Sequence, residues 1–367
     1  MSLLRRLHSE FGQSPWLDNL RRGWITDGQL VALRDRGVRG LTSNPTIFQK
    51  AIQGSSDYDA QFASLSRANI APVDAYWEMV LRDIDAALDV FAPVYAASDG
   101  ADGFVSVEVD PGLANDGTGT LLAARLLHER VARRNVMIKI PATMEGLPAI
   151  RTMIAEGRSV NVTLIFSLER YRDVIEAYLL GLEDRLAGGV QDLSPIASVG
   201  SFFISRVDTE VDRRLEAIGG SAVSLCGKAA VAQGQLAYAL FREKFSGERW
   251  AKLARHGARV QRPLWASTST KNPSYRDTLY VDELIGPDTV NTLPDATLEA
   301  FDHHGRVART VDADVESALR SWNNIAEAGV DLSAVADVLE REGVSSFQKS
   351  FDELLAALTS KASELRS

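Results

Sequence analysis

The chain has 367 residues, of which 45% are hydrophobic and 24% are charged, proportions that are ordinary for a globular protein. The formal charge of −9, with no concentrated block of Lys and Arg, argues against a nucleic-acid-binding surface. No apolar run approaches the roughly 20 residues that a membrane-spanning helix needs, and the N-terminus lacks the apolar core of a signal peptide. We therefore expect a cytoplasmic protein with neither a membrane nor a nucleic-acid partner.

The numbers and spacing of cysteine and histidine residues indicate a protein of a reducing compartment without a metal site. A single cysteine, Cys226, cannot form an internal disulfide, which is typical of proteins in a reducing cytosol. The histidines do not show the spacing of a zinc site. We expect no metal centre.

Short β-favouring segments alternate with longer helical patterns along the chain. The predicted strands are 15–17, 39–42, 104–109, 135–140, 160–165, 196–200, 263–267 and 289–293. Helices are predicted at 121–131, 168–186, 209–218 and 228–245, where apolar residues recur at helical spacing. Eight strands alternating with helices indicate a (β/α)8 barrel, an α/β fold. A doubly wound open sheet is the alternative, but it usually has a Gly-rich first turn that this chain lacks.

Two long segments fall outside the strand–helix alternation. Residues 49–101 are expected to hold extra helices between the second and third strands, and residues 312–367 to form packed helices. No Pro/Ser-rich spacer, repeat or low-complexity segment divides the chain. We therefore predict one domain over residues 1–367, with 312–367 a C-terminal helical extension packed on the barrel.

Lys139 lies within the apolar segment 135–140, where a charged amine is costly unless it is paired or neutral. Polar side chains also occur late in several other predicted strands, on one parity within each strand. They are Thr42 and Asn44, Ser106, Glu108 and Asp110, Asn161 and Thr163, and Ser267, Ser269 and Lys271. Because alternate side chains point into a barrel, and the late positions reach its carboxyl end, these residues predict an active site there.

Each of these residues could have a purely structural role when it is taken alone. Lys139 could hold its amine in water, with Glu108 as a salt-bridge partner. Further structural roles would be a turn or helix start at Asn44–Pro45, a helix cap at Asp18, mutual hydrogen bonding of Asn161 and Thr163, a surface charge at Arg206 and a capped turn at 115–120. Together, however, these residues place an amine beside acid and amide groups at one barrel mouth, and packing alone does not account for that combination.

Six segments of the chain resemble motifs of the transaldolase family, in the family's order. They are residues 40–46, 105–109, 137–143, 160–167, 197–208 and 265–273. The resemblance covers about residues 14–305 and is to the longer bacterial form of the family. It implies a cytosolic (β/α)8 enzyme of the pentose phosphate pathway. Such an enzyme moves a dihydroxyacetone unit from sedoheptulose 7-phosphate to glyceraldehyde 3-phosphate, giving erythrose 4-phosphate and fructose 6-phosphate.

The resemblance also implies catalytic roles. Lys139 would form an imine with the C2 carbonyl, as an electron sink for cleavage between C3 and C4, and burial favours the neutral amine that must attack. Asp18 would take the proton of the C4 hydroxyl and return it during addition. Glu108 would act through a water molecule that Thr163 helps to hold.

Substrate-binding roles follow from the same motifs. Asn44 and Asn161 would bind the dihydroxyacetone hydroxyls, and Thr42 is placed with them. Ser201, Arg206 and Lys271 would bind the sugar phosphate, with Ser269 nearby. Lys271 stands where better-known family members have an arginine, so we expect phosphate binding to depend more on Arg206. The family requires no metal or organic cofactor.

Two other functions remain open at this point. The first is a sugar-phosphate aldolase, a lyase that uses the same imine but releases dihydroxyacetone; its shorter relatives lack the acid found here at Glu108. The second is a sugar-phosphate-binding barrel without catalysis. The sequence does not decide between a monomer and a homodimer, nor does it give a role to residues 312–367.

Overall fold

The computed structural model describes residues 2–365 and contains a closed barrel of parallel strands. The strands follow one another around the barrel in chain order, and β1 pairs with β8 to close it. They are β1 (Gln13–Leu17), β2 (Leu41–Thr42), β3 (Val105–Glu108), β4 (Val136–Pro141), β5 (Val160–Ile165), β6 (Ser198–Phe203), β7 (Gln261–Ala266) and β8 (Thr289–Leu293). The predicted (β/α)8 fold is confirmed, and the open-sheet alternative is wrong.

Every predicted strand is present, although some ends differ. β6 continues three residues past its predicted end, because Ser201, Phe202 and Phe203 pair with β7. Gly200 therefore lies within this strand rather than ending it. A side chain at this position would meet the ring of Tyr171, with its Cβ 3.0 Å from Cε2, so glycine permits close packing of helix on strand here.

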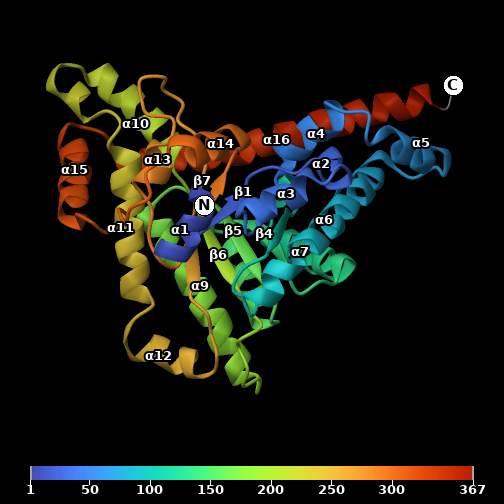
Figure 1. Ribbon diagram of the computed structural model, residues 1–367, viewed down its shortest axis with the longest axis horizontal. Helices are drawn as coiled ribbons and strands as arrows, with labels where there is room; N and C mark the ends of the chain where they lie inside the picture. The colour runs from blue at the N-terminus through green and yellow to red at the C-terminus, as the bar shows by residue number, and fades with distance from the viewer. Residues whose placement is uncertain (1, 366–367) are drawn as a thin grey trace.

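Helices surround the barrel (Figure 1). They are α1 (Leu3–Phe11), α2 (Arg22–Thr26), α3 (Gln29–Arg36), α4 (Pro45–Gln53), α5 (Asp59–Arg67), α6 (Pro72–Ala97), α7 (Gly117–Val131), α8 (Gly146–Ala155), α9 (Leu168–Ala187), α10 (Ser205–Ile218), α11 (Ala229–Lys244), α12 (Gly247–Arg255), α13 (Leu279–Asp282), α14 (Asp295–His304), α15 (Val315–Glu327) and α16 (Leu332–Glu364). Short 3-10 helices lie at Pro111–Leu113 and Gly220–Leu225. Within residues 2–365, no helix combines the length and the apolar character that crossing a membrane would require.

The predicted helices correspond to α7, α9, α10 and α11. The extra helices expected between the second and third strands are α4, α5 and α6, and those expected near the C-terminus are α15 and α16. The Gly-rich segment 115–120 is a capped helix start, as predicted, because Asp116 accepts a hydrogen bond from the backbone of Gly119 at 2.9 Å.

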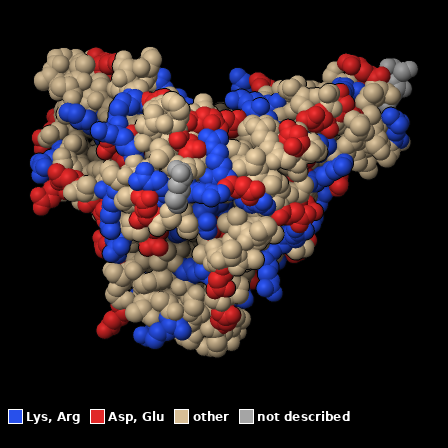
Figure 2. Space-filling view, in the orientation of Figure 1, with Lys and Arg blue, Asp and Glu red and all other residues tan. Residues whose placement is uncertain are grey.

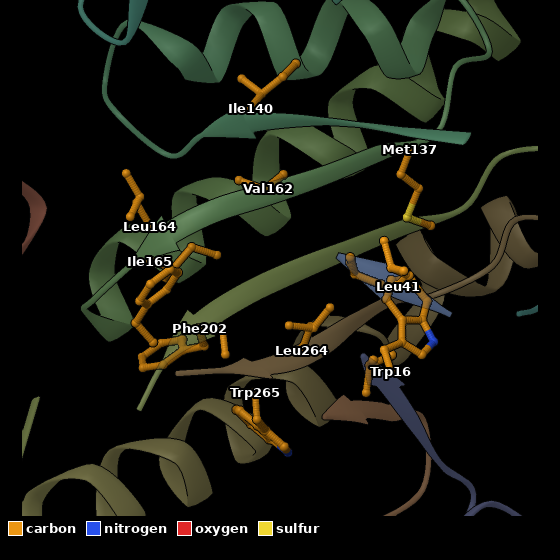
Figure 3. Close-up of a cluster of buried hydrophobic side chains, with 14 of the residues drawn as sticks. Trp16, Leu41, Met137, Ile140, Val162, Leu164, Ile165, Phe202, Leu264 and Trp265 are labelled. Atoms are coloured by element: carbon orange, nitrogen blue, oxygen red, sulfur yellow. The ribbon is translucent and has the colours of Figure 1, made fainter. Parts of the chain in front are cut away.

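The hydrophobic core lies largely between the strands and the helices around them (Figure 3). Ile140 and Trp265 extend from their strands toward helices on different sides of the barrel, and both are fully buried. Since successive side chains of a strand face opposite sides, Ile140 pointing outward leaves Lys139 pointing into the barrel.

A buried charge cluster joins strands at the amino end of the barrel. Asp102, 2% exposed, accepts hydrogen bonds from Ser14, from Trp16 Nε1 at 2.8 Å and from Arg39 Nε at 2.7 Å. Arg262 lies 3.6 Å from the same carboxylate. Burial raises the pKa of Asp102, but the charges of Arg262 and Arg39 and the Ser14 hydrogen bond outweigh it and hold this pKa below its ordinary value.

The longest helix, α16, lies over the carboxyl ends of the strands and continues beside α4 toward the C-terminus (Figure 1). Gly343 allows a close approach, because a Cβ there would lie 2.9 Å from Leu164 Cδ2. Further along, Ser350 and Thr46 share a hydrogen bond of 2.8 Å. The rings of Phe351 and Tyr76 lie edge to face with their centroids 5.2 Å apart.

Basic and acidic side chains are interspersed over the face of the molecule drawn in Figure 2. Elsewhere on the surface, charged side chains form ion pairs, such as Arg249 with Glu176 at 2.8 Å and with Glu183 at 2.7 Å. Pairs of this kind contribute little to stability, because water screens them.

Candidate active site

A cavity of about 340 Å³ opens at the carboxyl end of the barrel, between the strand ends and α16. It is lined by Asp18, Thr42, Asn44, Thr46, Ile47, Lys50, Lys139, Thr163, Ser201, Phe203, Arg206, Ala266, Ser267, Ser269, Lys271, Thr292, Pro294, Ser346 and Phe347. A larger hollow of about 720 Å³ is lined by residues at the strand starts, such as Val136, Ser159 and Arg259. None of the predicted site residues lines that hollow, so the smaller cavity is the candidate site.

Lys139 and Glu108 form a buried ion pair beside this cavity. They are register partners on β4 and β3, and Lys139 Nζ lies 3.0 Å from Glu108 Oε2. Lys139 also donates a hydrogen bond to the carbonyl oxygen of Ser43 at 3.2 Å. Neither oxygen of Glu108 accepts a well-directed hydrogen bond from the part of the chain that the structure describes. Burial raises the pKa of Glu108, and the charge of Lys139 opposes the increase.

Asp18 follows β1 and faces the same cavity. Its Oδ1 accepts a hydrogen bond of 2.9 Å from Thr42 Oγ1, which lies 2.7 Å from the hydroxyl of Thr292. Burial raises the pKa of Asp18, while the positive charge of Lys139 and the Thr42 hydrogen bond lower it. Asp18 is therefore a carboxyl group whose affinity for a proton is increased, as a general base requires.

The two asparagines are held differently. Asn161 lies beneath the cavity, where its Nδ2 donates to Ser106 Oγ at 3.0 Å and its Oδ1 accepts from Ser201 Oγ at 2.7 Å. Asn44 lines the cavity and caps α4, because its Oδ1 accepts from the backbone of Ile47 at 2.9 Å. Among the described residues, the amide nitrogen of Asn44 has no acceptor, so it is free to bind a ligand.

Thr163 lies at an irregularity in β5. The register between β5 and β6 shifts between Val162 and Ile165, and Leu164 has a φ of 60°, in the left-handed region that a non-glycine residue rarely adopts. The buried Oγ1 of Thr163 has no hydrogen-bond partner in residues 2–365. Strained strand segments with unused hydrogen-bonding groups are frequent at functional sites.

Besides Lys139, three cationic side chains line the cavity: Lys50, Arg206 and Lys271. Arg206 is the second residue of α10, and its guanidinium lies 5.5 Å from the ring centroid of Phe203. Lys271 donates to Ser269 Oγ at 2.6 Å, and partial burial of its amine together with the charges of Arg206 and Lys50 lowers its pKa. Neither Arg206 nor Lys50 forms an ion pair with any described acid, so both can bind an anion.

The structure brings the predicted site residues to one end of the barrel. All residues that were given a catalytic or binding role line the cavity except Glu108 and Asn161, which are joined to the lining residues Lys139 and Ser201. Among the other polar residues late in the strands, Ser267 lines the cavity, whereas Ser106 bonds to Asn161 and Asp110 caps the 3-10 helix at Pro111–Leu113. Of the purely structural roles, the ion pair of Lys139 with Glu108 and the helix start at Asn44 are present. The proposal of a solvent-held amine is wrong, because Lys139 is only 4% exposed.

The structural roles considered for Asp18, Asn161 and Arg206 are wrong. Asp18 does not cap a helix, because the next helix begins at Arg22 with Arg21 as its cap. Asn161 and Thr163 do not bond to each other, because Asn161 bonds to Ser106 and Ser201. Arg206 is not simply a surface charge, because it lines the cavity.

The sequence pattern did not reveal several lining residues. Thr46, Ile47 and Lys50 follow Asn44 at helical spacing, so a helix starting at Pro45 would have placed them on one face. Ser346 and Phe347 reach the cavity from α16, a helix that follows all eight strands in the chain, and no local sequence pattern signals this tertiary contact.

A buried lysine paired with a carboxylate, at the carboxyl end of a parallel barrel, is an arrangement suited to an enzyme that forms an imine with a carbonyl substrate. A sequence model of the family described as Transaldolase/Fructose-6-phosphate aldolase matches residues 15–358. The chain belongs to this family.

Similar proteins of known name agree with this assignment. The chain is 53% identical to "Transaldolase" of Mycolicibacterium smegmatis over 353 residues, which cover 95% of each chain. It is 52% identical to "Transaldolase" of Acidothermus cellulolyticus over 353 residues, covering 96% of this chain and 95% of that protein. It is 50% identical to "Transaldolase 1" of Streptomyces coelicolor over 359 residues, covering 97% and 94%. The predicted family, and with it transaldolase function as a transferase, are confirmed.

Proposed function

We propose that this protein transfers a dihydroxyacetone unit between sugar phosphates through an imine on Lys139. The donor is sedoheptulose 7-phosphate, the acceptor is glyceraldehyde 3-phosphate, and the products are erythrose 4-phosphate and fructose 6-phosphate. The observation that carries the proposal is the buried Lys139–Glu108 pair, 3.0 Å apart, with Asp18 lining the same cavity.

The first half-reaction forms and breaks covalent bonds at Lys139. Its neutral amine attacks the C2 carbonyl, and loss of water from the adduct gives a protonated imine. Asp18 then takes the proton of the C4 hydroxyl, the bond between C3 and C4 breaks, and its electron pair moves into the imine to form an enamine. The aldose product leaves, and the three-carbon enamine stays on the lysine.

The second half-reaction runs the same steps in reverse with a new aldehyde. The enamine attacks the acceptor, Asp18 returns its proton to the new hydroxyl, and hydrolysis of the imine frees the ketose. Glu108 exchanges protons with the departing and the attacking water. Glu108 beside Lys139 and Thr163 in the cavity wall both have side-chain oxygens without a hydrogen-bond partner among the described residues. These oxygens could bind that water molecule, which supports the proposed proton exchange.

Substrate binding divides between two groups of side chains. Asn44, Asn161 and Thr42 bind the dihydroxyacetone hydroxyls and orient the enamine between the half-reactions. Arg206 and Lys271, with Ser201 and Ser269, bind the phosphate. Arg206 carries more of this binding, because a guanidinium can donate two parallel hydrogen bonds to a phosphate and an ammonium cannot.

We further propose that the chain folds as a single domain. We also propose that the protein acts in the cytoplasm, as an enzyme of the pentose phosphate pathway. Residues 312–365, the part of the C-terminal extension that the structure describes, belong to that domain, because α16 packs on β5 and α4 and lines the cavity. Sugar phosphates are the partners, without nucleic acid or membrane.

The test is a coupled assay that measures sedoheptulose 7-phosphate formed from fructose 6-phosphate and erythrose 4-phosphate. Turnover that requires both substrates supports the transferase. Release of dihydroxyacetone from fructose 6-phosphate alone, at a rate equal to transfer, would indicate the aldolase instead. Binding without turnover in either assay would indicate a sugar-phosphate-binding barrel.

A further inference from the structure

The face of α16 that lies on the barrel mouth carries Gly343, Phe347, Ser350 and Phe351, which recur at helical spacing. Three of them attach the helix to the barrel and its flanking helices, as Gly343 packs on Leu164, Ser350 bonds to Thr46, and Phe351 packs on Tyr76. Phe347 lies between these attachments and is 4% exposed. The contacts of Gly343 before it and of Ser350 and Phe351 after it along α16 therefore hold Phe347 over the cavity.

The ring of Phe347 faces the amine of Lys139. Lys139 Nζ lies over the ring, 5.7 Å from its centroid, and both residues line the cavity. The negative face of an aromatic ring attracts a cation within about 6 Å, most strongly when water is excluded. Glu108 lies 3.0 Å from the same nitrogen, so the amine has a carboxylate and a ring face as neighbours.

We propose that Phe347 is a catalytic residue that stabilises the protonated imine on Lys139 and shields the enamine from water, so that α16 sets the balance between transfer and release. This inference rests on the proposed imine chemistry. Condensation places a positive charge on Nζ, where the ring can stabilise it. Cleavage between C3 and C4 then removes that charge, because the electron pair enters the imine.

Shielding decides the fate of the enamine. With an aldehyde present, C3 of the enamine forms a new carbon–carbon bond, which is transfer. If C3 instead takes a proton from water, the enamine becomes the protonated imine of dihydroxyacetone, and attack of water on its C2 releases free dihydroxyacetone and the lysine amine. A bulky apolar side chain over Nζ hinders both reactions with water.

The experiment compares Phe347→Ala and Phe347→Leu with the unsubstituted protein. Sedoheptulose 7-phosphate formation is measured with both substrates, and free dihydroxyacetone is measured with fructose 6-phosphate alone. We expect Phe347→Ala to lower kcat for transfer about tenfold and to increase the ratio of release to transfer. Phe347→Leu restores the apolar cover but not the ring, so we expect the normal ratio with a reduced kcat.

Phe351→Ala is the matched control, because Phe351 is also 4% exposed and lies one turn further along α16, against Tyr76. It should lower the melting temperature about as much as Phe347→Ala while keeping the normal ratio of release to transfer. A change of that ratio in Phe351→Ala equal to the change in Phe347→Ala would overturn the inference, because helix docking rather than the ring would be responsible.

Two further outcomes also contradict the inference. An unchanged ratio in Phe347→Ala would exclude shielding, and a normal kcat in Phe347→Leu would exclude a role for the ring face. Both are distinct from failure of the proposed function, which would show as absence of a borohydride-trapped adduct on Lys139 in the unsubstituted protein.

Discussion

The amine of Lys139 lies 3.0 Å from the carboxylate of Glu108, across neighbouring parallel strands whose register makes the two residues direct partners. Both side chains are buried, and Lys139 also lines the cavity. A buried ion pair is weak evidence for stability, because desolvation offsets the attraction. A chemical role for both groups accounts better for a paired amine and acid at this end of a barrel.

Glu108→Gln tests the proton-transfer role of that acid. The amide keeps the size of the side chain but cannot exchange a proton, so imine formation and hydrolysis should slow about 100-fold. The measurement is the rate of borohydride-trapped adduct formation with fructose 6-phosphate. Glu78→Gln, on an exposed pair with Arg130, is the control. An unchanged trapping rate in Glu108→Gln would exclude this role.

Thr42→Val tests Asp18 as the base. The hydroxyl of Thr42 donates to Asp18 Oδ1 at 2.9 Å and lowers a pKa that burial has raised. Without this hydrogen bond the pKa of Asp18 should rise further. Because the base must be ionised to accept a proton, the acidic limb of kcat/KM should move to higher pH. A limb that stays in place, or moves to lower pH, would contradict the assignment.

Arg206→Ala and Lys271→Ala test the phosphate site. Loss of a charge-assisted, two-pronged interaction should raise KM for fructose 6-phosphate about 10- to 100-fold in Arg206→Ala, and less in Lys271→Ala. Arg213→Ala is the control, since Arg213 lies on the same helix, α10, and is paired with Glu210 at the surface. Equal KM values for Arg206→Ala and the unsubstituted protein would exclude a role of Arg206 in phosphate binding.

Asp102 should matter for stability and not for catalysis, because it lies at the opposite end of the barrel from the cavity. Asp102→Asn breaks a buried charge cluster and should cost about 3 kcal/mol in the free energy of unfolding, measured by urea denaturation. Asp99→Asn, which alters an exposed pair with Arg259, should change little.

The pH dependence of that stability has a definite sign. In the folded protein the pKa of Asp102 is below its ordinary value. Ionised Asp102 therefore adds to the free energy of unfolding at pH values above its pKa in the unfolded chain, and this contribution is lost as the pH falls through its pKa in the folded protein. Asp102→Asn should therefore make unfolding less sensitive to acid. An unchanged acid sensitivity would mean that Asp102 does not govern it.

The eight strands could be predicted because each is a short β-favouring run separated from the next by helical periodicity. The position of the site could be predicted because polar residues on β3, β4 and β5 share a parity. The roles that the family motifs imply for these residues stay predictions. The end of β6 could not be predicted, since pairing with β7 extends it through Phe203. The position of α16 over the cavity could not be predicted either, because this helix, which carries Phe347, is placed by tertiary contacts alone.

The most direct test of the central claim is to trap the imine. The protein is incubated with fructose 6-phosphate, reduced with sodium borohydride, digested and analysed by mass spectrometry, with Lys139→Met as the control. The imine mechanism predicts a three-carbon adduct on the peptide that carries Lys139, and no adduct in Lys139→Met. Full activity without any adduct, or an adduct on a different lysine, would contradict it.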